Sequence, residues 1–287
     1  MNKKESKKSG FVVMVGRSNV GKSTLLNALV GTKVAITTPK PQTTRTTIQG
    51  IVHDPRGQIV FIDTPGIFHK AKDTLTKKLN KRVREAMKGI DALIYVTDPT
   101  RPIGPEEREL LGMIDLIKKP KILTINKTDI KDSPYIEEYR AMSRNFDKTI
   151  EISAKESKNI NKIIDEIFEI LPEGESYYPE HQLTNIENKI WVAELIREKV
   201  FTQIHQEIPY SIHVEVDEIT EKSNGIVYIK GRIITDSKRY KGMIVGKDGR
   251  MIKSIGQSTR RELEAVMDKK VYLELEVEVE EHWAERI

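Results

Sequence analysis

The sequence contains no cysteine among its 287 residues. This absence excludes disulfides, zinc sites with cysteine ligands, cysteine-ligated iron–sulfur clusters and a cysteine nucleophile, and it fits a reducing compartment. The longest apolar runs, at 11–15 and 92–96, have five residues, whereas a membrane-spanning helix needs about 20. The first nine residues are rich in lysine and lack an apolar stretch, unlike a secretory signal or a transit peptide. We therefore expect a cytoplasmic protein without a membrane span.

Histidine and aromatic residues are also sparse. The six histidines are scattered along the chain, and aromatic residues make up 6 % of it. We therefore expect no histidine-based metal site, because such sites need clustered ligands. Apolar residues make up 38 % and charged residues 32 %, which is enough apolar material for folded cores.

Residues 1–172 alternate short apolar runs with helical patterns, which is typical of a mostly parallel sheet covered by helices. We predict an α/β domain with a mixed, mostly parallel sheet. The expected strands are 11–15, 46–52, 58–62, 91–97, 121–125 and 149–152. The expected helices are 22–30, 75–87, 105–117, 135–142 and 160–171.

An acidic stretch that contains proline and glycine follows, and we place a linker at 173–182. Residues 183–287 have a different pattern and form a second, α+β domain in this interpretation. Its expected elements are a helix at 185–201, strands at 211–216 and 225–234, a short helix, a helix at 250–267 and a strand at 271–279. This order is helix–strand–strand–helix–helix–strand.

The segment from Gly16 to Ser23 fits the P-loop pattern G-x-x-x-x-G-K-[ST] and lies between a predicted strand and a predicted helix. That context is the one the pattern requires, because backbone N–H groups and the helix N-terminus then surround phosphates. Lys22 is expected to reach the β- and γ-phosphates, and Ser23 to bind Mg²⁺. The predicted phosphate-binding residues are Gly16, Arg17, Ser18, Asn19, Val20, Gly21, Lys22, Ser23 and Thr24.

Three further segments follow predicted strands and indicate that the bound nucleotide carries a guanine base. Asp63, at the end of the third strand, is suited to a water-mediated contact with Mg²⁺. Asp129 can accept both N1–H and the N2 amino group of guanine, a donor pair that adenine lacks, and the N–H of Ala154 is expected to face guanine O6. The predicted residues in these segments are Asp63, Thr64, Pro65, Gly66, Asn126, Lys127, Asp129, Ser153, Ala154 and Lys155. Ligands bind at this edge of open α/β sheets.

These motifs resemble those of translation-factor-related GTPases, and the sequence Gln-Thr-Thr-Arg at 42–45 resembles the first switch of the Era family. The resemblance implies that Thr44 closes on Mg²⁺ and the γ-phosphate, and that the segment from Thr32 to Arg45 is ordered by nucleotide. Lys22, Thr44 and Gly66 are then the expected catalytic residues. Ser23, Thr44 and Asp63 are the expected Mg²⁺ site.

Ile67 stands where Ras-like enzymes have the glutamine that orients water. Because isoleucine carries no proton donor or acceptor, we expect slow intrinsic hydrolysis and name no general base. The resemblance implies a potassium ion at Asn19 as a source of positive charge, and a turn-forming asparagine is the alternative. Arg17 and Arg45 are expected to be exposed.

A second glycine-rich loop resembles the GXXG core of a KH domain, and the element order is that of the type II KH fold. Residues 238–261 contain eight cations and a single acid, Asp248, which is typical of a nucleic-acid-binding face. Without nearby aromatic residues, we expect bases to lie in an apolar groove. The predicted RNA-binding residues are Ile244, Val245, Gly246, Lys247, Asp248, Gly249, Arg250, Ile252 and Lys253.

The resemblance to the Era family covers nearly the whole chain. It implies a GTPase that binds GTP, GDP and Mg²⁺, binds the 3′ end of small-subunit (16S) ribosomal RNA rather than DNA, and acts in assembly of the 30S subunit. It also implies peripheral association with the cell membrane. Two alternatives stay open at this point. One is a membrane-associated signalling GTPase whose KH-like module binds a protein, and the other is a non-catalytic RNA chaperone with structural GTP.

Overall fold

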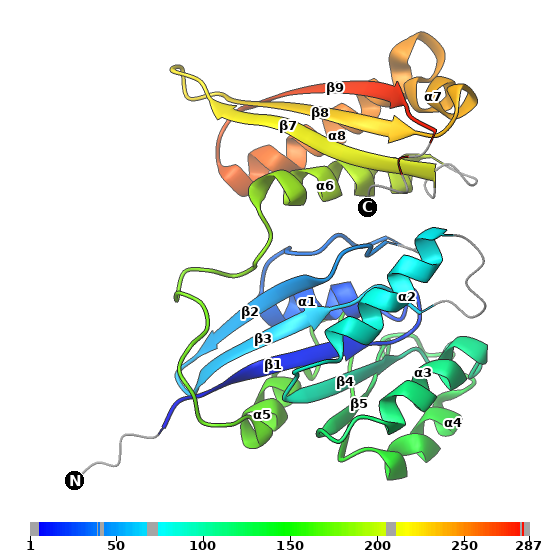
Figure 1. The fold of residues 1–287 in the computed structure, drawn as a ribbon, viewed down its shortest axis with the longest axis vertical. Coiled ribbons are helices and arrows are strands. Elements are labelled where there is room, and N and C mark those ends of the chain that lie inside the picture. Colours follow the sequence, from blue (N-terminus) through cyan, green and yellow to red (C-terminus); the bar gives the residue numbers. More distant parts are fainter. Residues whose placement is uncertain are drawn as a thin grey trace. The chain divides into compact units, whose positions relative to one another are not determined.

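The computed structural model describes residues 6–38, 40, 43–67, 74–204, 211–281 and 283. It divides the chain into two compact units, Met1–Asn185 and Ile186–Ile287 (Figure 1). Each unit contains its own cluster of buried apolar side chains. Within the described ranges, no helix is both long and apolar enough to cross a membrane.

The first unit is built on a six-stranded sheet with the strand order β2-β3-β1-β4-β5-β6. β2 runs antiparallel to β3 and the other neighbours are parallel, which confirms the predicted mixed, mostly parallel sheet. β4 is buried along its whole length, as expected for a strand covered on both faces. The strands are β1 (Lys8–Val15), β2 (Ile48–Asp54), β3 (Gly57–Asp63), β4 (Ala92–Thr97), β5 (Lys121–Ile125) and β6 (Lys148–Glu151).

The helices of this unit have local start and stop signals. α1 ends at Gly31, whose φ of +78° suits glycine and whose N–H donates to Asn27 O. α3 begins at Pro105, and the Glu107 carboxylate accepts the N–H of Gly104 at 3.0 Å. The helices are α1 (Lys22–Val30), α2 (Thr74–Ala86), α3 (Pro105–Asp115), α4 (Ile136–Ala141) and α5 (Ile160–Ile170). α1 and β5 have the predicted bounds.

The stretch that we expected to be a linker, 173–182, differs from that expectation because it is bonded to the first unit. Gln58 on β3 is fully buried, and its Oε1 accepts the N–H groups of Tyr177 and Tyr178 at 2.8 and 3.0 Å. Its Nε2 donates to Tyr178 O at 2.8 Å. Further on, Ile51 N on β2 donates to Leu183 O at 2.9 Å. The division between the units therefore falls after Asn185, three residues beyond the end of the expected linker.

The second unit contains a three-stranded sheet with the order β7-β8-β9, in which β8 is antiparallel to β7 and parallel to β9. Its element order is α6-β7-β8-α7-α8-β9, as the sequence predicts for a type II KH fold. The elements are α6 (Asn188–Gln203), β7 (Ile212–Glu221), β8 (Val227–Thr235), α7 (Lys238–Val245), α8 (Arg250–Met267) and β9 (Val271–Val279).

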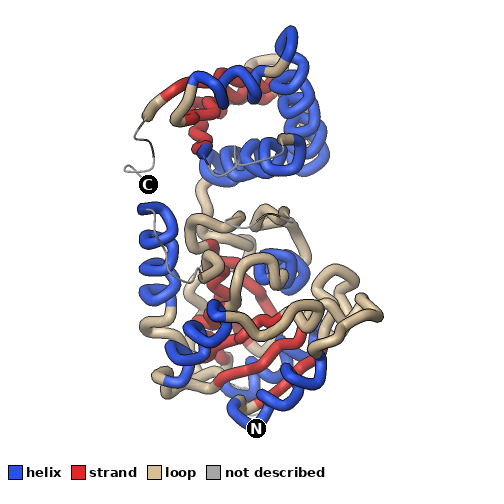
Figure 2. The backbone as a smooth tube through the Cα atoms, turned by 90° about the vertical axis from the view of Figure 1, so that its right-hand side faces the viewer, coloured by secondary structure: helices blue, strands red, loops and turns tan. Residues whose placement is uncertain are grey.

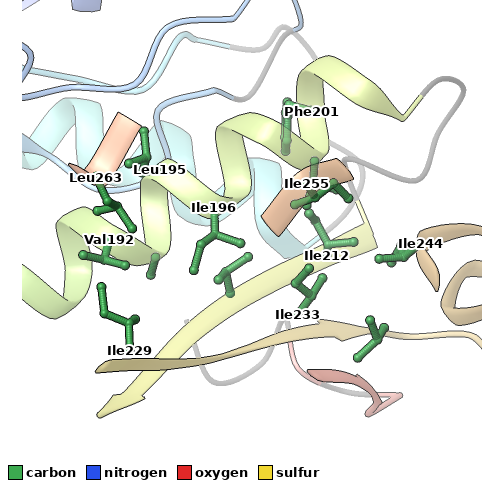
Figure 3. Close-up of a cluster of buried hydrophobic side chains, with 14 of the residues drawn as sticks. Val192, Leu195, Ile196, Phe201, Ile212, Ile229, Ile233, Ile244, Ile255 and Leu263 are labelled. Carbon is green, nitrogen blue, oxygen red and sulfur yellow. The ribbon is translucent and has the colours of Figure 1, made fainter. Parts of the chain in front are cut away.

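The core of the second unit lies between its helices and one face of its sheet. The helices gather on one side of the strands (Figure 2). Ile196 from α6, Ile229 and Ile233 from β8 and Ile255 from α8 are fully buried in one cluster (Figure 3). Because alternate residues of a strand point to opposite faces, Ile229 and Ile233 face this core together. The packing fixes α8 on the sheet and so positions the loop that precedes α8.

Candidate nucleotide and RNA sites

The P-loop connects β1 to α1, so its backbone wraps around the N-terminus of a helix. Lys22, the first residue of α1, is buried, and its Nζ donates to the carbonyl oxygens of Gly16 and Arg17 at 2.8 and 2.9 Å. Burial lowers the pKa of Lys22 to about 8, although attraction by Asp63 opposes this effect. The ammonium group is therefore held at the centre of the loop, where a phosphate would bind.

The glycines of this site are required by close backbone contacts. A Cβ on Gly66 would lie 2.3 Å from Ser18 Oγ and 2.7 Å from Ser18 N, so the loop after β3 touches the P-loop. Gly21 has a φ of +99°, and a Cβ there would lie 2.3 Å from Asn126 Nδ2. A side chain at either position would push apart loops that together form the site.

Three oxygen-bearing side chains meet beside Lys22. Ser23 Oγ lies 2.6 Å from Asp63 Oδ2, and Thr44 Oγ1 lies 2.9 Å from Ser23 Oγ and 3.3 Å from Asp63 Oδ2. Burial raises the pKa of Asp63. Among the described residues, its Oδ1 is buried without a hydrogen-bond partner. Mg²⁺ prefers oxygen ligands from few side chains, with waters and phosphates completing its shell, so this cluster fits the expected Mg²⁺ site.

The first switch segment is more buried than its Thr-, Pro- and Lys-rich composition indicates. The Asn27 side chain on α1 accepts the N–H groups of Val34 and Ala35 at 3.0 and 2.9 Å and donates to Ala35 O at 2.8 Å. Sequence reasoning missed Asn27, because nothing in a helix pattern shows that a polar side chain binds a later loop. Gln42 of the expected switch motif lies outside the described residues.

The nucleotide cavity has a volume of about 400 Å³ and combines the P-loop with the first switch segment. It is lined by Ser18, Asn19, Gly21, Lys22, Ser23, Thr24, Ile36, Thr37, Thr38, Thr43, Thr44 and Gly66.

The predicted base-binding residues form a hydrogen-bonded group at the ends of β5 and β6. Asn126 Nδ2 donates to Val20 O at 2.8 Å, and Ser153 Oγ donates to Asp129 Oδ1 at 2.6 Å. The N–H of Ala154, which we expected to face guanine O6, instead donates to Asn126 Oδ1 at 2.9 Å. The Asn126 side chain thus bonds both to the P-loop and to the loop after β6. The Ala154 N–H therefore faces Asn126 and not the base. Asp129 keeps a second carboxylate oxygen and has Ser153 to fix its orientation.

The predicted RNA loop turns sharply between α7 and α8. Gly246 and Gly249 have φ values of +73° and +72°, and a Cβ on Gly246 would lie 2.7 Å from Met251 Cβ. Ile244 is fully buried and anchors the loop, whereas Lys247 and Arg250 are exposed. Backbone phosphates can therefore approach the loop closely beside two exposed cations.

Comparison with known proteins relates both units to families. The family described as "50S ribosome-binding GTPase" matches residues 11–127, and the KH domain family matches residues 207–284. GTPase Era of Halothermothrix orenii is 41 % identical over 286 residues, which cover 98 % of this chain and 96 % of that protein. GTPase Era of Carboxydothermus hydrogenoformans is 42 % identical over 285 residues, or 97 % and 94 %. The chain belongs to the Era family of GTPases.

A solved structure of an Era protein has the same fold over the whole chain. It is described as Era in complex with MgGDPNP and nucleotides 1506–1542 of 16S ribosomal RNA. It aligns with a TM-score of 0.91 at 36 % identity and covers 98 % of this chain and 96 % of that one. The fold class predicted from the sequence, a P-loop GTPase domain followed by a KH domain, is confirmed. As a member of the Era family, the chain is a GTPase that binds GTP and GDP.

A groove beside the KH loop of this Era-family chain has an apolar floor. It lies between α8 and β9, is open to solvent, and has a volume of about 700 Å³. Sequence reasoning predicted such a groove and placed Ile252 and Lys253 near the loop, but it missed the β9 side chains. The lining residues are Ile252, Lys253, Gly256, Gln257, Arg260, Leu273 and Leu275. Leucines at 273 and 275 alternate with Glu274, so one face of β9 lines the groove and the other is acidic.

Arg17 and Arg45, which we expected to be exposed, are buried in this Era-family structure, with exposed fractions of 9 % and 3 %. Arg17 pairs with the buried Glu107 of α3, with its Nε 2.6 Å from Oε1, because an unpaired buried carboxylate would be costly. Ile67 is also buried, and its backbone forms a bridge with that of Arg17. The second switch thus begins with a side chain that packs into the core.

The lowered pKa of Lys22 predicts a proton-linked nucleotide affinity for this Era-family protein. Bound phosphates favour the charged form, so Lys22 should take up a proton when GDP binds above about pH 8 and much less than one near about pH 7. Calorimetry in two buffers of different ionisation enthalpy measures this uptake. Equal proton uptake at both pH values would contradict the assignment.

The same lowered pKa affects folding in the absence of nucleotide. Between about pH 8 and 10.5, Lys22 binds more protons in the unfolded chain than in the folded protein. This group therefore makes the free energy of unfolding rise with pH in that window.

Proposed function

We propose that this GTPase binds the 3′ end of 16S ribosomal RNA through its KH domain, under the control of GTP, and acts in the cytoplasm in assembly of the 30S subunit. The observation that carries the proposal is the whole-chain similarity to an Era protein solved with MgGDPNP and nucleotides 1506–1542 of 16S ribosomal RNA. The exposed GXXG loop and the groove between α8 and β9 support it, because KH domains clamp single strands in this way.

The nucleotide chemistry is assigned to the residues that meet at the P-loop. Backbone N–H groups of the loop and the Lys22 ammonium hold the phosphates, and Asp129 reads the base. Ser23, Thr44 and Asp63 would hold Mg²⁺, which supplies positive charge to the phosphate oxygens when bound. Gly66 presents its N–H to the γ-phosphate in this proposal. Because Ile67 is buried and apolar, its side chain cannot orient water at that position, and we expect slow hydrolysis.

Control by GTP is proposed to run through β2. This strand follows the switch residue Thr44, and its antiparallel partner β3 ends at Asp63. On its outer edge, β2 is bonded to the stretch that leads into the second unit, through Ile51 N to Leu183 O and Gln49 N to Asn185 Oδ1, both 2.9 Å. A nucleotide-dependent movement of Thr44 can therefore pass along β2 to that stretch. Since coupling of two binding equilibria is reciprocal, RNA should also tighten GTP binding.

The proposal is tested by titrating a short single-stranded RNA from the 16S 3′ end and a scrambled RNA of the same composition. The protein is loaded with GDP or with a non-hydrolysable GTP analogue, at one salt concentration of about 150 mM, because electrostatic affinity depends on salt. We expect tighter, sequence-selective binding in the GTP form. Equal affinity in both nucleotide states would contradict control by GTP. Equal, weak binding of both RNAs would favour a membrane-associated signalling GTPase with a protein partner.

A potassium ion at Asn19 is a further part of this proposal. Asn19 lines the nucleotide cavity together with Lys22 and Ser23, and its φ of +65° turns the loop at that point. A monovalent cation there would stabilise charge that develops on the phosphates. We expect GTP turnover to be faster in potassium than in sodium, and the difference to disappear in Asn19→Ala. Equal turnover in the two salts would overturn the potassium site.

A further inference from the structure

Asp98 belongs to none of the nucleotide motifs, yet it is buried at the same edge of the sheet. It follows β4 directly, and its exposed fraction is 1 %. The neighbouring strands β1 and β5 end in the P-loop and in the segment of Asn126, Lys127 and Asp129. A buried carboxylate between these two loops needs partners, because an uncompensated buried charge is strongly destabilising.

Each oxygen of the Asp98 carboxylate has two polar contacts. Oδ1 accepts the N–H and the hydroxyl of Thr100 at 3.1 and 2.7 Å. Oδ2 accepts Lys127 Nζ at 2.6 Å and Arg101 Nε at 3.1 Å. Burial alone would raise the pKa of Asp98, but the hydrogen bonds from Lys127 and Thr100 outweigh it, and the pKa lies below the ordinary aspartate value. Asp98 is therefore ionised at neutral pH.

The two cations lead from Asp98 to opposite sides of the nucleotide site. Lys127 belongs to the base-binding segment, and its φ of +65° is unusual for a lysine. Arg101 extends the other way, and its Nη2 donates to Ser18 O of the P-loop at 2.9 Å. The Arg101 carbonyl in turn accepts the hydroxyl of Tyr139 at 3.3 Å. One carboxylate thus links the base side of the site to the phosphate side through two ion pairs.

We propose that Asp98 is a positioning residue for guanine nucleotide, which fixes Lys127 beside the base and, through Arg101, the P-loop around the phosphates. The inference rests on the nucleotide site proposed above. If Asp98 only balanced the charge of Lys127 and Arg101, its removal would leave two cations without their anion. The site would then attract an anionic nucleotide more strongly, and nucleotide affinity would rise. Loss of positioning instead weakens binding although the site has become more positive.

The test is the dissociation rate of fluorescently labelled GDP from Asp98→Asn, measured by displacement with unlabelled GDP. We expect dissociation to be about tenfold faster or more, since charged hydrogen bonds of this kind are individually strong. In a Lys127→Met background, Asp98→Asn should add much less than it does alone, because coupled residues are not additive. Slower or unchanged dissociation from Asp98→Asn would overturn the proposal, and so would full additivity with both Lys127→Met and Arg101→Met.

Thr100→Val is the matched control, because it removes a hydrogen bond to Oδ1 and leaves both ion pairs on Oδ2. We expect its dissociation rate to stay within about twofold of the unmodified protein, because the ion pairs that hold Lys127 and Arg101 remain. If Asp98→Asn does not fold, the GDP dissociation rate of Arg101→Met tests the proposal instead. The Arg101 side chain is 39 % exposed, so the fold should tolerate this substitution. Its dissociation should be faster, and an unchanged rate would overturn the proposal. GDP binding by the unmodified protein, measured first, tests the nucleotide site separately.

Discussion

Asp129→Asn is expected to change the preferred base from guanine to xanthine. The Asp129 carboxylate can accept two donors of guanine, and Ser153 Oγ holds its Oδ1 at 2.6 Å, so its orientation is set before nucleotide binds. An asparagine offers one acceptor and one donor. This pair matches N1–H and O2 of xanthine but leaves the guanine amino group facing a donor. A site built for specific hydrogen bonds rejects a mismatched ligand strongly. We expect GDP affinity to fall by about 10³-fold, from two charged hydrogen bonds lost.

Competition between GDP, xanthosine diphosphate and ADP for a labelled nucleotide measures this exchange. Asp132→Asn is the matched control, because Asp132 is exposed three residues further along the chain and makes the same change of charge. The control should retain the affinity for GDP. Unchanged GDP affinity in Asp129→Asn would show that another group reads the base, and equal losses for GDP and xanthosine diphosphate would point to a structural effect.

Reversing the charge of the KH loop is expected to abolish selective RNA binding. Lys247 and Arg250 are exposed beside the glycines that let a phosphate backbone approach. Lys247→Glu with Arg250→Glu replaces two favourable phosphate contacts with repulsion. We expect a loss of about 10²-fold or more in affinity for the 16S 3′-end RNA and a shallower salt dependence by about two contacts. Binding measured across a salt series gives both quantities.

The matched control makes the same charge reversals elsewhere in the KH domain. Lys222 directly follows β7 and Lys270 directly precedes β9. Both lie far from the loop along the chain, and both are exposed. Lys222→Glu with Lys270→Glu should change RNA affinity by no more than about threefold, the effect of net charge alone. Equal losses in the two double variants would mean that net charge, rather than the loop, binds RNA. GTP turnover without RNA should be the same in both.

The P-loop and the GXXG loop could be predicted from the sequence because each is a local pattern between two elements. Asp98 and Glu107 could not, because each pairs with a residue that is far away in the chain and near only after the sheet has formed. Asn27 binds a loop only seven and eight residues later, but a helix pattern does not show which way its side chain is used. Ala154 shows the same limit within a recognised motif. Its N–H was expected to face the base, but Asn126, 28 residues earlier, holds it.

β7 shows how a backbone irregularity hides a strand. The alternation of apolar and polar residues ends at Val216, and the sequence therefore predicts that the strand ends there. In the structure β7 continues to Glu221, past a bulge between Val216 and Glu218 that shifts the register with β8. A bulge adds one residue and changes which side chains face the core. Beyond the bulge, the alternation of apolar and polar residues is shifted by one residue relative to the part before it. The sequence of the rest of the strand therefore resembles a polar loop.

The bonding of 173–185 to the first unit has a consequence for solubility. β2 is an edge strand of the sheet, and open strand edges pair readily with other chains and lead to aggregation. Here Leu183 O and a backbone bridge between Gly50 and Thr184 occupy part of that edge. A GTPase fragment that ends at residue 172 would therefore expose this strand edge and remove the backbone groups of Tyr177 and Tyr178 that bond to the Gln58 amide. A fragment that ends at Asn185 keeps the edge covered, so the connection between the domains also protects the sheet from self-association.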